Sequence, residues 1–191
     1  MKNFIGRSSN GRTEAFEAFN RGPIPCLPAK LKMLKTKYQN RDPQLETSGK
    51  IIGFYEREFY CFSNFSSFQV KWKGKLWSTS EHAYQAAHFF KTAPKLAEKI
   101  YKAKSAHEAF KIAKTNADKA PKDWEQKKVA IMEDIVRHKL KQNPYVMHKL
   151  LQTGKKYLVE DSPKDDCWGW GLKRNGRNEL GKIWMKLRDE M

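Results

Sequence analysis

WSTSEHAYQAAHFF, the stretch from Trp77 to Phe90, is where a helix signal and a set of reactive side chains coincide. The letters STSE at positions 78–81 match a capping box, in which a serine accepts a hydrogen bond from a helical amide and the glutamate reaches back to the cap. The stretch therefore predicts a helix that starts at Ser78. Two roles stay open for Glu81, which either closes this box or takes part in chemistry.

The rest of the helix bears on that choice. Tyr84, Gln85 and His88 follow Glu81 by three, four and seven residues and therefore share its helix face. The opposite face is apolar and is expected to pack against a core; it consists of Ala83, Ala86, Ala87 and Phe90. A face that only meets solvent would more often carry pairs of lysine and glutamate. The row of carboxylate, phenol, amide and imidazole therefore indicates a functional site.

Composition fits a globular protein with a large positive charge. The 191 residues suffice for one domain with a core plus an extension. The net charge is +17: residues 1–50 hold 10 Lys and Arg against 4 Asp and Glu, and residues 51–191 hold 28 against 17. This excess indicates a polyanionic partner such as nucleic acid, or a phosphate-bearing ligand. A basic protein without such a partner is the alternative.

Several classes are disfavoured. No run of about 18 apolar residues suggests a membrane span, and no apolar segment near the start resembles a secretory signal. The three cysteines are too few and too widely spaced for a disulfide framework or a zinc site, so we predict no metal and no cofactor. An intracellular location, in cytoplasm or nucleus, fits best. Lys2, Arg7 and Arg12 resemble an organelle transit peptide, but Glu14 and Glu17 interrupt that pattern.

Two regions differ in their patterning. Residues 1–50 are rich in Gly, Asn, Ser and Pro and are predicted to form a basic, loosely structured extension, with short helices expected at EAFEAF and LKMLKTKY.

Residues 51–191 are predicted to form one domain. Strands are expected at 51–55 and 157–160, with a hairpin over 68–77 that bends at Gly74. Helices are expected from Ser78, from Pro94, from Ser105, through Trp124 to a stop before Pro144, from Pro144, and from Asn178. The predicted fold class is a mostly helical α+β domain with a small β-sheet.

Two further segments carry polar groups that packing does not require. Ser63 and Asn64 stand between Phe62 and Phe65, either as a simple turn or as a polar pair that contacts a ribose or the edge of a base. The second segment is the loop 161–177, which is long enough to suggest a function.

This loop offers several kinds of group. Its glycines permit close approach to a ligand and its tryptophans can stack a base; these residues are Trp168, Gly169, Trp170 and Gly171. Three basic residues, Lys173, Arg174 and Arg177, precede Asn178. Asn178 is expected to cap the last helix, whose free amides would suit a phosphate beside these cations.

Glu81 and Asp165 form a candidate acid pair. Glycosidic cleavage needs one carboxylate to stabilise an oxocarbenium-like sugar or to activate water, and another group to protonate the leaving base. Trp124 and Trp168 could supply aromatic walls for that base, whereas Trp184 is expected in the core.

TSEHAYQA, the dipeptide DW at 123–124, LVEDSPKDDCWGWG and NELGKIWMKLR, in this order, resemble the NADAR superfamily of YbiA-like N-glycosidases. CFSNF matches the opening segment of that family, and the resemblance covers about residues 51–190. It implies a compact α+β domain that hydrolyses the C–N bond between a ribose and a base or amine. By the same resemblance, the catalytic glutamate, tryptophan and aspartate fall on Glu81, Trp124 and Asp165.

One departure and several alternatives accompany this resemblance. Many family members have lysine where this chain has His88. The family acts on guanine that carries ADP-ribose and on ribosylated intermediates of riboflavin synthesis. We expect the first substrate class, with ADP-ribose as the product ligand and nucleic-acid backbone as a partner. A riboflavin-pathway hydrolase and a binding module without turnover are the alternatives.

Overall fold

The computed structural model describes residues 49–55 and 58–191. The expectations for residues 1–48, including both short helices, lie outside the described residues. Within the described part, no helix has both the length and the apolar character needed to cross a membrane.

A short parallel pair of strands brings together two distant parts of the chain. β1 (Ile51–Gly53) pairs with β4 (Tyr157–Val159), with Ile52 opposite Leu158. Both strands were expected, but their pairing was not, because about a hundred residues separate them. The pairing places the end of β4, and the loop that follows it, beside the start of the domain.

The second pair is the predicted hairpin. β2 (Val70–Trp72) runs antiparallel to β3 (Lys75–Trp77). Lys73 and Gly74 both have positive φ angles, of 48° and 77°, as a two-residue type I′ turn requires. The predicted hairpin is therefore confirmed, and the small sheet consists of two separate two-stranded pairs.

Helices form most of the rest, which confirms the predicted mostly helical α+β class. The α-helices are α3 (Ser80–Ala87), α4 (Pro94–Tyr101), α5 (Ala106–Thr115), α6 (Trp124–Gln142), α7 (Pro144–Gln152) and α8 (Glu179–Asp189). Short 3₁₀ turns occur at Tyr60–Phe62 (η2) and Ala117–Lys119 (η3). Prolines open α4 and α7, where the missing amide would have had no partner. The serine cap expected for α5 is present, because Ser105 Oγ accepts from the Glu108 amide at 3.1 Å.

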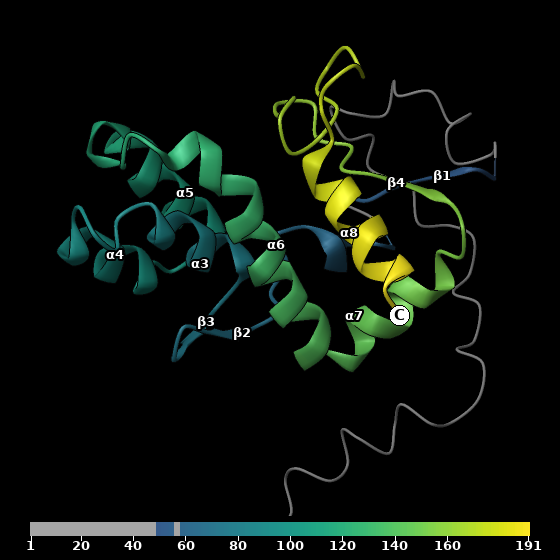
Figure 1. Cartoon of the computed structure of the whole chain (residues 1–191), viewed down its shortest axis with the longest axis horizontal. Helices are drawn as coiled ribbons and strands as arrows, with labels where there is room; N and C mark the ends of the chain where they lie inside the picture. Colours follow the sequence, from purple (N-terminus) through teal and green to yellow (C-terminus); the bar gives the residue numbers. More distant parts are fainter. Residues whose placement is uncertain (1–48, 56–57) are drawn as a thin grey trace, which may run out of the picture. The chain divides into compact units, whose positions relative to one another are not determined.

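α6 is the central element of the described part. It contacts α3 and β2, and it also contacts α7 and α8 (Figure 1). The core around it contains several fully buried aromatic side chains, among them Trp72, Trp77 and Trp184. Trp184 donates its indole N–H to the Phe62 carbonyl at 2.9 Å, so the predicted core role of Trp184 is confirmed.

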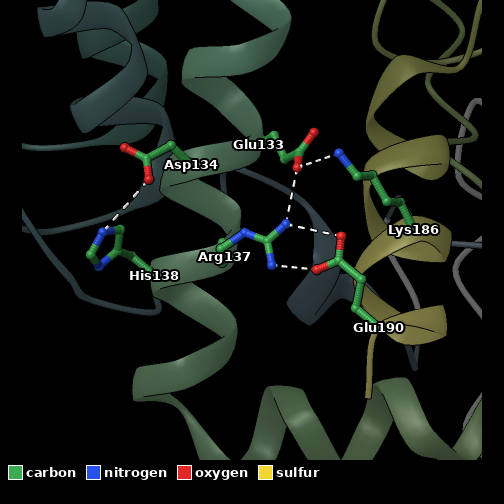
Figure 2. A network of polar contacts seen from close by, with 6 residues as sticks. All are labelled: Glu133, Asp134, Arg137, His138, Lys186 and Glu190. Atoms are coloured by element: carbon green, nitrogen blue, oxygen red, sulfur yellow. Dashed lines mark hydrogen bonds and ion pairs between the residues drawn. The ribbon is translucent and has the colours of Figure 1, made fainter.

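Polar contacts join α6 to α8 at the surface. Glu133 accepts from both Arg137 and Lys186, and Arg137 also pairs with Glu190 near the end of α8 (Figure 2). Exposed ion pairs of this kind contribute little singly and more as a network. Here they align α8, whose first residues bound the long loop.

Candidate active site

Glu81 lies in the first turn of α3. The helix cap is Thr79, whose hydroxyl accepts from the His82 amide at 3.3 Å and lies 2.8 Å from His82 Nδ1. The predicted serine–glutamate capping box is therefore wrong, because threonine and histidine close it instead. Three consecutive hydroxyl side chains precede Glu81, and each of them is an acceptable cap. The carboxyl group of Glu81 is left for other partners.

Glu81 is almost completely buried. Its side chain is 4% exposed, and Gln85 Nε2 donates to its Oε1 at 2.6 Å. Burial raises the pKa of Glu81 to about 7; the hydrogen bond from Gln85 opposes this rise and the charge of Asp165 adds to it. Both protonation states are therefore populated near neutral pH, as a catalytic acid or base requires.

Glu160 is a second buried carboxyl, which the sequence analysis missed. It follows β4 directly and is 7% exposed. Burial raises its pKa to about 8; the charges of Asp165 and Glu81 add to the rise, and Lys139 opposes it. Its backbone is held on both sides, since its amide donates to Asn178 Oδ1 at 3.0 Å and its carbonyl accepts from Trp170 at 3.3 Å. Its place between a strand and a long loop was the available signal.

Lys139 is a buried lysine whose charge acts on Glu160. Its side chain has no exposed surface, and Nζ donates to the Ser63 carbonyl at 2.9 Å and to Ser66 Oγ at 2.8 Å. Burial lowers its pKa to about 7, against the opposing charges of Cys61 and Glu160. The sequence signal was its position on the inward stripe of α6, one turn after Ile135.

Asp165 joins this cluster from the loop. Its Oδ1 accepts from the amides of Cys167 and Trp168, at 2.9 Å and 2.8 Å. These two bonds hold the loop turn and orient the carboxylate. Its charge contributes to the raised pKa values of both Glu81 and Glu160, so the structure brings the candidate acid pair of Glu81 and Asp165 into one cluster. Whether Asp165 acts in catalysis stays a prediction.

Aromatic rings cover one side of the cluster. Tyr84 lies 5.4 Å from Trp124 and 5.3 Å from Trp168 between ring centroids. His88 lies 3.7 Å from Trp124, and its buried Nε2 has no hydrogen-bond partner among the described residues. Burial lowers the pKa of His88 to about 4, so its imidazole is neutral at pH 7. Burial also raises the pKa of the Tyr84 phenol, which stays protonated.

The turn at Ser63 and Asn64 lies against the start of α3. The Asn64 carbonyl accepts from the Glu81 amide at 3.1 Å, while Asn64 Oδ1 is buried and has no partner within the described residues. Ser80 Oγ is also buried and also has no hydrogen-bond partner among the described residues. Such buried unpaired polar atoms are rare in folded proteins. Ser63, by contrast, holds the turn through its hydroxyl and carbonyl.

The glycines of the loop serve its own packing. A Cβ atom on Gly169 would lie 2.4 Å from the Glu160 carbonyl, and Gly171 has a φ of 66°. Trp170 donates to Asp161 at 2.7 Å, and the guanidinium of Arg174 lies 5.5 Å from its ring. These contacts fix the shape of the loop around Trp170, whereas Trp168 is the loop tryptophan that contacts Tyr84.

The predicted phosphate site at the start of α8 is not formed. Asn178 has a left-handed backbone, and its side chain bonds to Leu158 and Glu160 instead of capping the helix. The amides of Glu179 and Leu180 already donate to loop carbonyls, both at 3.1 Å. The long loop folds back over the helix end, which sequence spacing could not show.

The basic residues of the loop remain at the surface. Lys173 and Arg177 are exposed, and Arg174 is half-buried against Trp170. Arg177 donates to the Cys167 sulfur at 2.7 Å. Within the described ranges, no group of three His, Cys, Asp or Glu side chains could hold a metal ion. The assembled site is therefore three carboxyl groups, one buried lysine and an aromatic wall.

The fold and the sequence together match a known class of domain. The NADAR domain model matches residues 53–191, and the chain belongs to that family. A solved structure, the NMR structure of YbiA from Escherichia coli, superimposes with a TM-score of 0.68 at 34% identity over 74% of this chain and 84% of that one.

Two curated relatives extend the comparison. An N-glycosidase of Nostoc punctiforme is 34% identical over 73% of this chain and 92% of its own length. A riboflavin biosynthesis protein of Vibrio vulnificus is 40% identical over 73% of this chain, and the match spans 38% of that protein. The chain thus spans well under half of the Vibrio relative and nearly the whole of the Nostoc one.

Proposed function

We propose that this protein removes ADP-ribose from guanine, in a nucleoside or within nucleic acid, by hydrolysing the C–N bond between the ribose and the base. The broader class, a hydrolase of N-glycosyl bonds, follows from the family and from its relatives named N-glycosidases. The observation that carries the proposal is the pair of buried carboxyls, Glu81 and Glu160, with pKa values raised to about 7 and about 8.

The two carboxyls divide the reaction between them. Burial raises the pKa of Glu160 further than that of Glu81, so we assign the proton to Glu160 and the negative charge to Glu81. As the glycosidic bond breaks, its electron pair goes to the leaving nitrogen, which takes the proton from Glu160. The negative charge of Glu81 stabilises the oxocarbenium-like sugar. Water then adds to the sugar carbon and gives its proton to a carboxylate of the cluster, which restores the site.

Other residues of the cluster position the substrate. Tyr84, Trp124 and Trp168 form a wall on which a purine can stack. The unpaired Asn64 Oδ1, beside Glu81, is suited to accept from a sugar hydroxyl or a base amino group. Asp165 acts through its charge on both glutamates, and Lys139 limits the pKa of Glu160.

Charge supports the choice of substrate. Residues 51–191 carry 28 basic against 17 acidic residues, with Lys173 and Arg177 exposed on the loop. The pyrophosphate of ADP-ribose offers these groups two anionic centres, and a nucleic-acid backbone offers more. Nucleic acid as a partner is part of this proposal.

A direct assay tests the substrate. The protein is incubated separately with ADP-ribosylated guanosine and with a ribosylated intermediate of riboflavin synthesis, and mass spectrometry follows the guanosine or amine that is released. We expect faster release of guanosine from the ADP-ribosylated nucleoside. Release only from the riboflavin intermediate would overturn the substrate but retain the reaction class.

The riboflavin substrate is the second candidate, because two relatives carry that name. The Vibrio protein is joined by a chloroplastic riboflavin biosynthesis protein of Zea mays, 33% identical over 88% of this chain but 30% of its own length. Absence of turnover on both substrates, with ADP-ribose still bound, would instead support a binding module.

A further inference from the structure

A cavity of about 740 Å³ is lined in part by the start of α3, but not by Glu81 or by Gln85, which bonds to its carboxyl group. Thr79 and His82 line it from α3, whereas Lys104 and His107 line it from the start of α5. Neither Glu81 nor any of its partners Gln85, Glu160 and Asp165 lines this space. The cavity is within the size range of small-molecule sites, roughly 300–1,000 Å³.

The inner wall of the cavity is uncharged, and the side chains of Thr79 and His82 have hydrogen-bond partners there. His82 is buried, with Nδ1 against the Thr79 hydroxyl at 2.8 Å and Nε2 against the Ala103 carbonyl at 3.2 Å. Burial lowers the pKa of His82, although the Ala103 carbonyl and the charge of Glu108 oppose this. A rigid, uncharged wall of this kind leaves selectivity to the rim and the aromatic side.

Aromatic rings form one side of the cavity. Phe65 is half-buried and held by Phe110 at 6.4 Å between centroids. Phe68 is stacked on Tyr145, at 5.8 Å and an interplanar angle of 9°. Rings that are fixed before a ligand arrives stack a planar base with little further ordering.

The rim provides positive charge and hydroxyl groups. Lys104 is exposed, and its ammonium group has no ion-pair partner among residues 49–55 and 58–191. The nearby acid, Glu108, is held by the Lys104 backbone amide at 2.7 Å. Ser67 and Ser78 are exposed on the rim, and none of the described lining residues is Asp or Glu. An anion is therefore favoured over a cation.

From this arrangement we infer a second binding site, separate from the Glu81 cluster, for a nucleoside monophosphate. Its base stacks on Phe65, beside the ring of Phe68 that Tyr145 and Lys139 already hold, and its phosphate meets Lys104 and the rim hydroxyls. The ligand is either a free nucleotide or one unit of a nucleic-acid strand, since both present the same chemistry. The inference does not depend on the reaction at Glu81.

Titration with adenosine monophosphate, followed by amide NMR shifts of the full chain, tests the site. We expect shifts at Ser67, Lys104 and His107, and smaller shifts with adenosine or inorganic phosphate alone. Shifts confined to the loop around Trp168, or equal shifts with inorganic phosphate, would overturn the inference.

Variants separate this site from the active site. Lys104→Ala should weaken nucleotide binding about tenfold, the effect of losing one charge-assisted hydrogen bond. Lys111→Ala changes an exposed lysine of α5, the helix that begins two residues after Lys104; Lys111 does not line the cavity, so this variant should leave binding unchanged. Both variants should hydrolyse a modified mononucleoside at the wild-type rate. Equal weakening in the two variants would show non-specific attraction and would remove the site.

A short oligonucleotide distinguishes the two sources of ligand. If a strand shifts the same amides at lower concentration than the mononucleotide, the cavity takes a unit of nucleic acid. If the mononucleotide binds as tightly or more tightly, the ligand is a free nucleotide. Shifts caused by the strand only outside the cavity, with no displacement of the mononucleotide, would exclude the strand as its source.

Discussion

Glu81 lies in the first turn of α3, and its carboxyl group does not take part in the helix cap. Glu81→Gln keeps the shape of the side chain but removes the negative charge that stabilises an oxocarbenium-like centre. We expect normal folding and a loss of kcat of at least about a hundredfold, the size typical of an electrostatic term. Glu98→Gln, an exposed acid on α4, is the matched control. A Glu81→Gln variant that keeps more than a tenth of wild-type kcat would return Glu81 to a structural role.

The pKa order of the two glutamates predicts the pH dependence. Activity should rise as Glu81 ionises through about pH 7 and fall as Glu160 loses its proton above about pH 8. Glu160→Gln should lower kcat and abolish the alkaline limb. Asp165→Asn should move the acidic limb to lower pH, because one charge that raises the pKa of Glu81 is gone. Steady-state kinetics from pH 5 to 10 measures both limbs, and an unchanged alkaline limb in Glu160→Gln would contradict the assignment.

Trp124 and Trp184 are both buried tryptophans with different surroundings. Trp184→Ala should lower the free energy of unfolding by about 3–5 kcal/mol, because it empties the core. Trp124→Ala should instead weaken ligand binding by roughly 1–3 kcal/mol, since it removes a stacking wall. Thermal melts and calorimetric titration with ADP-ribose compare the two. If Trp124→Ala lowers stability as much as Trp184→Ala and leaves affinity unchanged, Trp124 belongs to the core.

At the scale of elements, the Asn178 side chain bonds the start of α8 to β4 and to Glu160. Asn178→Ala would leave the Glu160 amide and the Leu158 carbonyl without partners and would place alanine at a φ of 53°. We expect a loss of about 2–4 kcal/mol in the free energy of unfolding, measured by urea denaturation. Activity should also fall, because Glu160 is no longer held. Asn175→Ala, exposed in the same loop, should change neither quantity.

Helices and turns whose boundaries are marked by their own residues could be predicted from the sequence, whereas pairings that depend on distant contacts could not. Pro94, Pro144 and the Lys73-Gly74 turn mark boundaries through their own backbone preferences. By contrast, the parallel pairing of β1 with β4 and the side-chain bonds of Asn178 depend on residues far along the chain.

The candidate site divides in the same way. The row of side chains on α3 could be read from helical spacing, because one element carries it. Lys139 and Glu160 acquire their roles only when α6 and β4 bury them near Glu81 and Ser63. The inward position of Lys139 on α6 marks it as buried, but helical spacing alone does not show which groups surround it.

For the whole molecule, charge is the property that bears on a nucleic-acid substrate. Residues 1–50 contribute 10 basic against 4 acidic residues, whereas the family model begins at residue 53. The match covers 92% of the Nostoc relative but 73% of this chain. The unmatched part of that relative is therefore too short to contain most of an extension like residues 1–50. Residues 51–191 are therefore expected to fold without it.

Deleting residues 1–50 should separate nucleic-acid affinity from catalysis. If the extension neutralises phosphates, each contact releases counterions, so log K against log salt should have a shallower slope for the truncated protein. Hydrolysis of a modified mononucleoside should be nearly unchanged, because the Glu81 cluster lies outside the deletion. Fluorescence anisotropy with a labelled oligonucleotide from about 50 to 200 mM salt measures the slope. Equal slopes for the two proteins would assign the phosphate contacts to residues 51–191, whose 28 basic residues outnumber 17 acids.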